Sequence, residues 1–154
     1  MDLGDLLKPE GVFASLRVKN KKQALRDLAG RASHITGLDE RQIFDTLLQR
    51  ERLGSTAVGR GIAIPHARIV GLTRIATVFA QLDDPIDFEA PDAEPVDLVF
   101  VLLAPEHAGA DHLKALARIS RVLRDPQTLE KLRAARDRDA LYAVLTEPLA
   151  SHAA

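Results

Sequence analysis

Two long β-rich apolar segments constrain the fold of this chain most strongly. They cover residues 74–82 and 96–104, and a connection rich in proline and aspartate separates them. Continuous apolar runs of this kind are typical of buried strands. We therefore expect two neighbouring strands inside a buried sheet.

A further strand and two helices are expected before these runs. Apolar residues alternate over 11–18, as in a half-buried strand. Asn20 is a suitable N-cap for a helix that ends at Gly37, and a second helix is expected from Asp39. Arg50 lies near the C-terminal end of that second helix.

Three helices are expected in the C-terminal third. Asp111 is the expected N-cap of the first, which would place His112 in its first turn. Asp125 and Asp137 are expected to begin the next two. Strands that alternate with helices predict a single α/β domain over 1–149, with helices on both faces of the sheet and a flexible tail at 150–154.

Composition limits the possible functions. The chain has 154 residues and a net charge of −1, which argues against binding to nucleic acid or anionic lipid through bulk charge. It contains no cysteine, and neither a signal peptide nor an apolar stretch long enough to span a membrane is evident. We expect a cytoplasmic protein without membrane insertion.

A cluster of hydroxyls, glycines and arginines precedes His66. Ser55, Thr56, Gly59 and Gly61 offer hydroxyl and backbone donors of the kind that a phosphoryl group requires. Because Pro65 restricts the backbone, His66 should emerge in a defined direction. A neutral imidazole, with an ordinary pKa of about 6.5, can attack phosphorus directly.

The residues around His66 also resemble a known family. Gly-Ile-Ala-Ile-Pro-His at 61–66, preceded by Arg-Glu and then Gly-Ser-Thr, is similar to the active-site signature of enzyme IIA domains of the fructose/mannitol class. These domains belong to the bacterial phosphoenolpyruvate-dependent phosphotransferase system. Residues 95–105 and 112–113 extend the resemblance over nearly the whole chain, which most resembles the nitrogen-related regulatory branch. The family implies a mixed sheet.

The resemblance implies roles for three residues. His66 would accept phosphate from a phosphorylated small histidine phosphocarrier protein, while Arg50 and His112 would stabilise the bound phosphate. Each role also has a physical basis, since a guanidinium can hold two phosphate oxygens and a helix N-terminus favours anions. Ser55 and Thr56 would either donate to the phosphate or hold their own loop through its backbone.

Two residues depart from the common family pattern. Arg60 stands in the glycine-rich segment where the family often has a small or neutral residue, and Ala67-Arg68 replaces a frequent glycine and lysine. Both arginines are candidates for phosphate binding or for the partner surface. We expect Arg60→Gly to weaken phosphoryl acceptance modestly, and an unchanged rate would assign Arg60 to the surface.

Three other functions remain open. The chain could be a sugar-specific enzyme IIA that passes phosphate to a separate IIB domain, or a regulatory binding module that does not depend on phosphate. A metallohydrolase using His66, His107 and His112 is a weaker alternative, because no carboxylate is evidently placed to complete the site. No metal or cofactor is expected.

Overall fold

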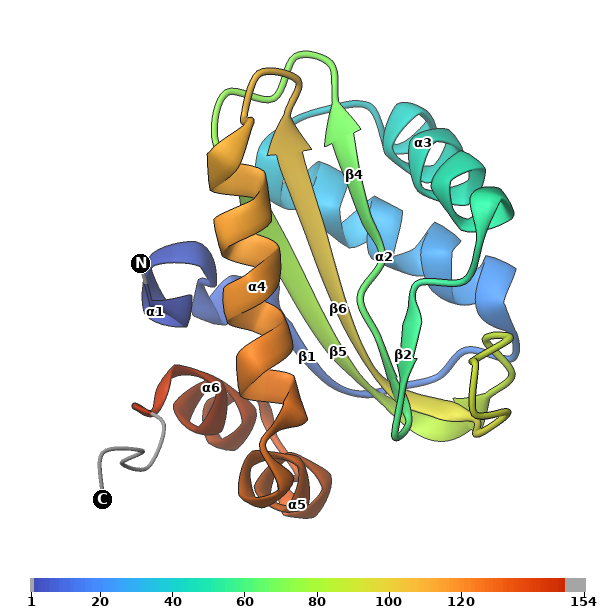
Figure 1. Cartoon of the computed structure of the whole chain (residues 1–154), viewed down its shortest axis with the longest axis vertical. Helices are drawn as coiled ribbons and strands as arrows, with labels where there is room; N and C mark the ends of the chain where they lie inside the picture. Colours follow the sequence, from blue (N-terminus) through green and yellow to red (C-terminus); the bar gives the residue numbers. More distant parts are fainter. Residues whose placement is uncertain (1, 149–154) are drawn as a thin grey trace.

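A mixed sheet forms the centre of the computed structural model, which describes residues 2–148 (Figure 1). Its strand order is β1-β5-β6-β3-β2, and β4 also pairs with β6. The strands are β1 (Val12–Leu16), β2 (Ala57–Gly59), β3 (Ile62–Ala63), β4 (His66–Ile69), β5 (Ala76–Ile86) and β6 (Val96–Pro105). The two predicted apolar strands, β5 and β6, are antiparallel neighbours, whereas β3 and β4 run parallel to β6.

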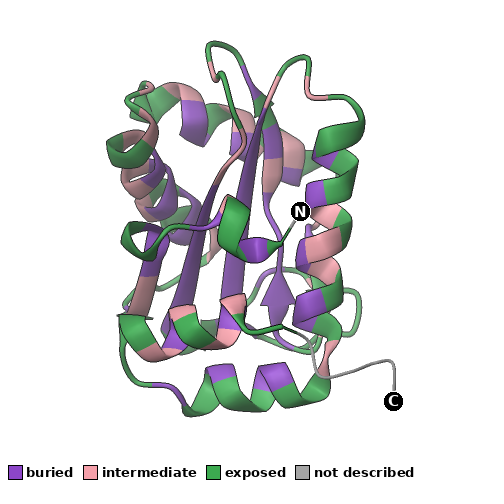
Figure 2. Cartoon of the chain, turned by 90° about the vertical axis from the view of Figure 1, so that its left-hand side faces the viewer, coloured by how far each residue is buried: buried purple, intermediate pink, exposed green. Residues whose placement is uncertain are grey.

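Helices cover both faces of this sheet. They are α1 (Leu3–Leu6), α2 (Lys21–Thr36), α3 (Glu40–Leu53), α4 (Ala110–Arg124), α5 (Pro126–Ala134) and α6 (Arg138–Thr146), and a short 3-10 turn spans Pro9–Gly11. One hydrophobic cluster lies between the sheet and helices α2 and α3, and a second lies between the sheet and helices α1, α4, α5 and α6. Figure 2 shows buried strands between helices whose outer surfaces are exposed. The predicted α/β fold with a mixed sheet is confirmed.

Most predicted helix boundaries are confirmed by their caps. The side chains of Asn20, Asp39, Asp125 and Asp137 each accept a hydrogen bond from a backbone N–H in the first turn of their helix. Asp111 is the exception, because α4 begins two residues earlier, at Ala110, and Gly109 is its N-cap. The predicted tail at 150–154 lies outside the described residues.

The glycine-rich segment is a β-hairpin rather than an open loop. Strands β2 and β3 are antiparallel, and Arg60 and Gly61 between them have φ angles of 59° and 79°. Two consecutive positive φ angles are typical of the type I′ turn, whose twist matches that of the paired strands. The glycines therefore serve a tight turn of the backbone.

Pro65 divides the strand that follows this turn. β3 and β4 both pair with β6, but the pairing is interrupted at Ile64 and Pro65. Proline has no N–H to donate to a neighbouring strand, and it favours extended backbone in the residue before it. The Pro65 carbonyl still accepts from the N–H of Leu102 at 2.9 Å, so His66 begins β4 in a fixed register.

Candidate active site

His66 lies at the start of β4, with its ring held by the backbone just before it. The imidazole Nδ1 is 2.8 Å from the carbonyl oxygen of Ile64. A carbonyl can only accept, so Nδ1 must carry the hydrogen in this contact. In neutral His66, the lone pair is therefore on Nε2.

His112 lies in the first turn of α4, beside His66. The two rings are in an edge-to-face arrangement, with centroids 5.8 Å apart and planes inclined by 72°. Arg68 follows His66 by two residues on β4, and its Nε donates to Nδ1 of His112 at 3.4 Å. Because Nδ1 accepts this bond, the ring hydrogen of neutral His112 is on Nε2.

The Nε2 atom of His112 is buried and has no hydrogen-bond partner among the described residues. A buried polar atom without a partner costs free energy, so in a native protein it calls for an explanation such as a catalytic role or a bound water or ion. The burial of His112, together with the charges of His66 and Arg68, holds the pKa of His112 below its ordinary value. The ring is therefore a neutral donor near pH 7.

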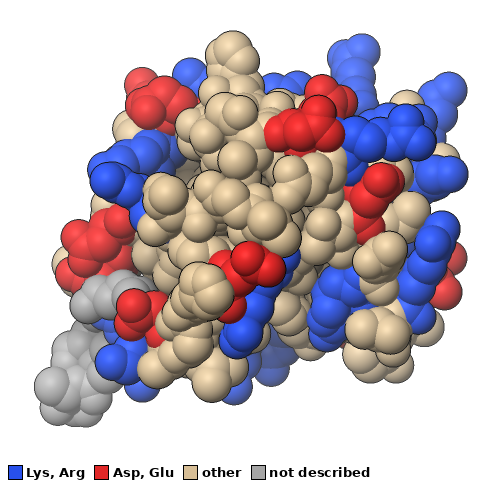
Figure 3. Space-filling model, turned by 90° about the horizontal axis from the view of Figure 1, so that it is seen from above, with Lys and Arg blue, Asp and Glu red and all other residues tan. Residues whose placement is uncertain are grey.

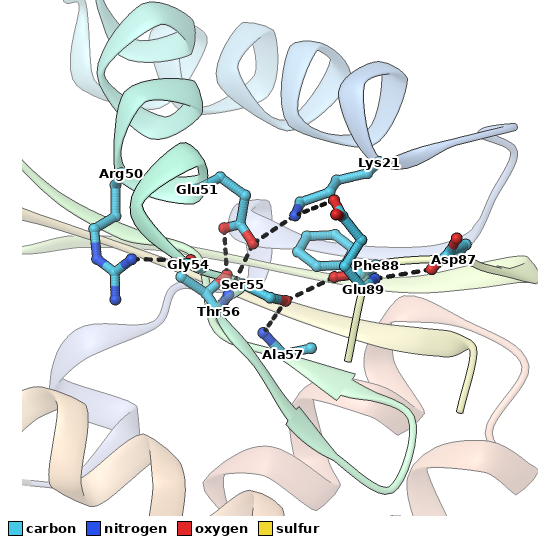
Figure 4. Close-up of polar contacts among 10 residues, drawn as sticks. All are labelled: Lys21, Arg50, Glu51, Gly54, Ser55, Thr56, Ala57, Asp87, Phe88 and Glu89. Carbon is cyan, nitrogen blue, oxygen red and sulfur yellow. Dashed lines mark hydrogen bonds and ion pairs between the residues drawn. The ribbon is translucent and has the colours of Figure 1, made fainter. Parts of the chain in front are cut away.

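Arg50 comes from the last turn of α3, which packs beside β4. Its Nη1 donates to the carbonyl of Gly54 at 3.0 Å, which holds the guanidinium over the loop after α3 (Figure 4). Arg50 is half-buried. It makes no direct hydrogen bond to His66 or His112 within residues 2–148.

The hydroxyls of Ser55 and Thr56 are engaged by the protein itself. Ser55 donates to the carbonyl of Phe88 at 2.6 Å, and Thr56 donates to Glu51 Oε2 at 2.6 Å (Figure 4). These contacts correspond to the loop-holding role, one of the two that the sequence left open.

Arg60 is separated from the two histidines. Its backbone N–H donates to Asp92, and its guanidinium reaches the carbonyl of Arg124 at the C-terminal end of α4. Arg124 is twelve residues beyond His112, a distance of about 18 Å along a helix. The structure thus brings Arg68 to the histidines and leaves Arg60 at the far end of α4.

No metal-binding cluster is found in the described part of the chain. Within residues 2–148, no three histidine or carboxylate side chains lie close enough together to hold an ion. His66 and His112 have no third ligand there, and the guanidinium of Arg68 lies next to them. The arrangement suits an anion better than a cation.

The family model described as "Phosphoenolpyruvate-dependent sugar phosphotransferase system, EIIA 2" matches residues 5–147. The chain belongs to this EIIA 2 family. The resemblance noted in the sequence is thereby confirmed.

The relatives indicate the regulatory branch of the EIIA 2 family. A nitrogen regulatory protein of Bradyrhizobium diazoefficiens is 58% identical over 99% of this chain and 100% of its own length. The crystal structure of the nitrogen regulatory protein IIA-Ntr from Neisseria meningitidis has a TM-score of 0.88 and 31% identity, covering 94% of this chain and 99% of that one. The IIA mannitol enzyme of Escherichia coli, solved in complex with phosphorylated IIB, shares the fold with a TM-score of 0.77 and 20% identity, over 92% and 98% of the two chains. This EIIA 2 protein is a regulatory component of the phosphotransferase system.

Sequence reasoning left one buried residue of this EIIA 2 site out of the chemistry. Glu51 is only 5% exposed and accepts hydrogen bonds from both the N–H and the hydroxyl of Thr56, while Lys21 forms an ion pair with it at 2.9 Å. One sequence signal is a carboxylate next to Arg50 and five residues before a threonine. Helical periodicity could have placed Glu51 inside, because it lies four residues after the buried Leu47.

The distribution of charged side chains on the surface of the EIIA 2 domain agrees with its net charge of −1. Figure 3, seen from the end where α4 begins, shows acidic and basic side chains interspersed around an uncharged centre. No helix within residues 2–148 is long and apolar enough to cross a membrane.

Proposed function

We propose that this protein is a phosphoryl carrier in which His66 Nε2 accepts phosphate from a phosphorylated small histidine phosphocarrier protein. The observation that carries the proposal is the buried Nε2 of His112, which has no hydrogen-bond partner within residues 2–148 and belongs to the ring beside His66. A phosphoryl group on His66 would supply the acceptor that this donor lacks. The proposal keeps the cytoplasmic location expected from the sequence.

The transfer needs no separate general base. The lone pair of His66 Nε2 forms the new P–N bond while the P–N bond of the donor histidine breaks, and the donor nitrogen keeps that electron pair. His66 Nδ1 retains its hydrogen, bonded to Ile64. Because such transition states are loose, positioning and stabilisation of the phosphoryl oxygens provide most of the catalysis.

His112 and Arg50 are the proposed stabilising donors. Arg68 holds His112 in the tautomer that presents Nε2–H. Because the pKa of His112 is lowered, the ring stays neutral near pH 7. Arg50 would move from Gly54 or share its remaining nitrogens with the phosphate, since a guanidinium has five N–H donors. Ser55 and Thr56 hold the loop in this proposal, and Arg60 has no part in the transfer.

We infer that the bound phosphate acts as a signal rather than as an intermediate in sugar uptake. The names of the more similar relatives, nitrogen regulatory proteins, support this reading. Phosphorylation would add about 1.5 to 2 negative charges at the site, enough to change which protein surface binds there. The regulated partner would distinguish the two forms, and a IIB domain is the alternative acceptor.

The test is to incubate the purified protein with phosphoenolpyruvate, enzyme I and the phosphocarrier protein. Intact mass and peptide mapping should find one acid-labile phosphate on His66, absent from His66→Ala. If cognate components leave the wild type unmodified, the carrier proposal is wrong, and the protein is a binding module that works without phosphate.

A further inference from the structure

Glu51 is connected to both ends of the proposed site. Its side chain is only 2% exposed, and its two carboxylate oxygens receive the Thr56 N–H at 2.8 Å, the Thr56 hydroxyl at 2.6 Å and the Lys21 ammonium at 2.9 Å. Burial of a carboxylate is costly unless donors of this kind surround it. Two of these three donors belong to Thr56, so the buried carboxylate holds Thr56 in place.

The first connection runs from Thr56 to His66. The Thr56 carbonyl accepts from the N–H of Ile64 at 3.0 Å, and the Ile64 carbonyl accepts from Nδ1 of His66 at 2.8 Å. Each residue in this series therefore holds the next one. The series is mechanical, because at Thr56 and at Ile64 the bonded N–H and carbonyl belong to different peptide groups.

The second connection runs from the same loop to Arg50. Gly54 lies two residues before Thr56, and its carbonyl holds the guanidinium of Arg50 (Figure 4). The N–H of Gly54 in turn donates to the main-chain carbonyl of Glu51 at 3.2 Å. The loop that aims Arg50 is thus fixed at one end by the backbone of Glu51 and at the other by its side chain.

Lys21 keeps the charge of Glu51 balanced. Its ammonium also forms an ion pair with Glu89 at 3.2 Å and lies 5.0 Å from the centre of the Phe88 ring. The main-chain carbonyl of Phe88 accepts a hydrogen bond from the Ser55 hydroxyl. The connection between β5 and β6 therefore holds the same loop from its other side.

We propose that Glu51 is a positioning residue for phosphoryl transfer, orienting His66 through Thr56 and Ile64 and Arg50 through Gly54. It touches neither the phosphate nor the reacting nitrogen. The kinetic part of this inference rests on the proposed function, whereas the orientation of the His66 ring is a property of the unphosphorylated protein. The two parts can therefore be tested separately.

The decisive variants are Glu51→Gln and Thr56→Val, with Thr56→Ser as the conservative rescue. Thr56→Val removes one donor without changing the shape of the side chain. The matched control is Thr128→Val on α5. Thr128 is 7% exposed, and it also donates both its N–H and its hydroxyl to one carboxylate, that of the N-cap Asp125. A merely structural loss should affect Thr56→Val and Thr128→Val alike.

The first readout is the tautomer of neutral His66, from long-range proton–nitrogen correlation spectra of the imidazole. Wild type, Thr56→Ser and Thr128→Val should show the hydrogen on Nδ1, while Thr56→Val and Glu51→Gln should show a mixture. The second readout is the phosphorylation rate, for which kcat should fall about 10- to 100-fold in Thr56→Val with KM for the phosphocarrier unchanged.

The possible outcomes decide both proposals. A folded Thr56→Val protein with the wild-type tautomer and kcat would overturn the inference, and so would equal losses in Thr128→Val. If Glu51→Gln fails to fold, Thr56→Val alone tests whether the contact between Glu51 and Thr56 orients His66. If the wild type accepts no phosphate, the carrier proposal fails, but the tautomer spectra still decide whether Glu51 orients His66.

Discussion

His66 and His112 have complementary hydrogen-bond partners. His66 gives its Nδ1 hydrogen to a backbone carbonyl, whereas His112 receives the Arg68 guanidinium on Nδ1. In their neutral forms, the first ring therefore has its lone pair on Nε2 and the second has a hydrogen there. With centroids 5.8 Å apart, the two rings present an unprotonated nitrogen and an N–H donor, the pair of groups that the proposed transfer requires.

Replacing His112 should slow phosphorylation of His66. His112→Phe keeps a planar ring but removes the Nε2–H donor, and loss of one such donor should lower the transfer rate about 100-fold. His112→Gln retains an amide donor and should fall between the two. The rate is measured by intact mass in a time course with excess phosphocarrier, and a wild-type rate in His112→Phe would exclude His112 from the chemistry.

The stability of the protein should depend on the protonation of His112. The pKa of His112 is lowered in the folded state. Between about pH 6.5 and that lower pKa, His112 therefore binds a proton in the unfolded chain but not in the folded one. Stability should therefore fall as the pH drops through this range, by at most about 1.4 kcal/mol per pH unit from this residue.

Urea unfolding of wild type and His112→Phe at pH 7.5 and pH 5.5 measures this contribution. The wild type should lose more free energy of unfolding between the two values than the variant, which has nothing to titrate at position 112. Equal losses in the two proteins would contradict a lowered pKa.

Arg60→Gly should leave phosphoryl transfer unchanged, contrary to the modest weakening expected from the sequence. Arg60 lies at the hairpin turn with a positive φ that glycine adopts readily, and its guanidinium donates to the carbonyl of Arg124 at the end of α4. Arg68→Gly is the comparison, because Arg68 contacts His112 and its loss should reduce the rate. A slower transfer in Arg60→Gly would show that Arg60 contributes to phosphoryl transfer after all.

Gly61→Ala should destabilise the fold by about 1–3 kcal/mol through backbone strain and close contact. A Cβ atom there would lie 2.6 Å from Arg133 Nη2 and 2.8 Å from Asp97 Oδ1. Gly37 has a similar positive φ but open space around it, so Gly37→Ala should cost only the backbone strain. Thermal or urea unfolding compares the two, and an equal cost would mean that the ion pair of Arg133 and Asp97 moves aside freely.

The sequence predicted the elements whose signals are local. Asn20 and Asp39 are side-chain caps, and the apolar stripes they begin pack on the sheet as expected. The resemblance to the enzyme IIA family selected His66 and His112, which lie together although β5, β6 and the loops around them separate the two in the chain. Their proximity depends on the pairing of β4 with β6, which periodicity does not reveal.

Other features depended on contacts between distant segments. The glycine-rich segment was interpreted as a phosphate-binding loop, because its composition suits that role as well as it suits a type I′ turn. Asp111 has the residue type of an N-cap, yet α4 begins at Ala110. Glu51 was left out of the chemistry, because the contacts that stabilise its buried carboxylate come from Thr56 in the next loop and from Lys21 on another helix.

The use of a main-chain carbonyl to hold His66 limits how substitution can alter the site. Many histidines are oriented by a carboxylate, which a single substitution can delete. At Ile64 every residue type supplies the same oxygen, so substitutions there can displace the acceptor but cannot remove it. The ring nitrogen of His66 that keeps its lone pair is therefore set by the path of the backbone, and a side-chain substitution should change it only where it displaces that backbone, as we expect at Thr56 and Glu51.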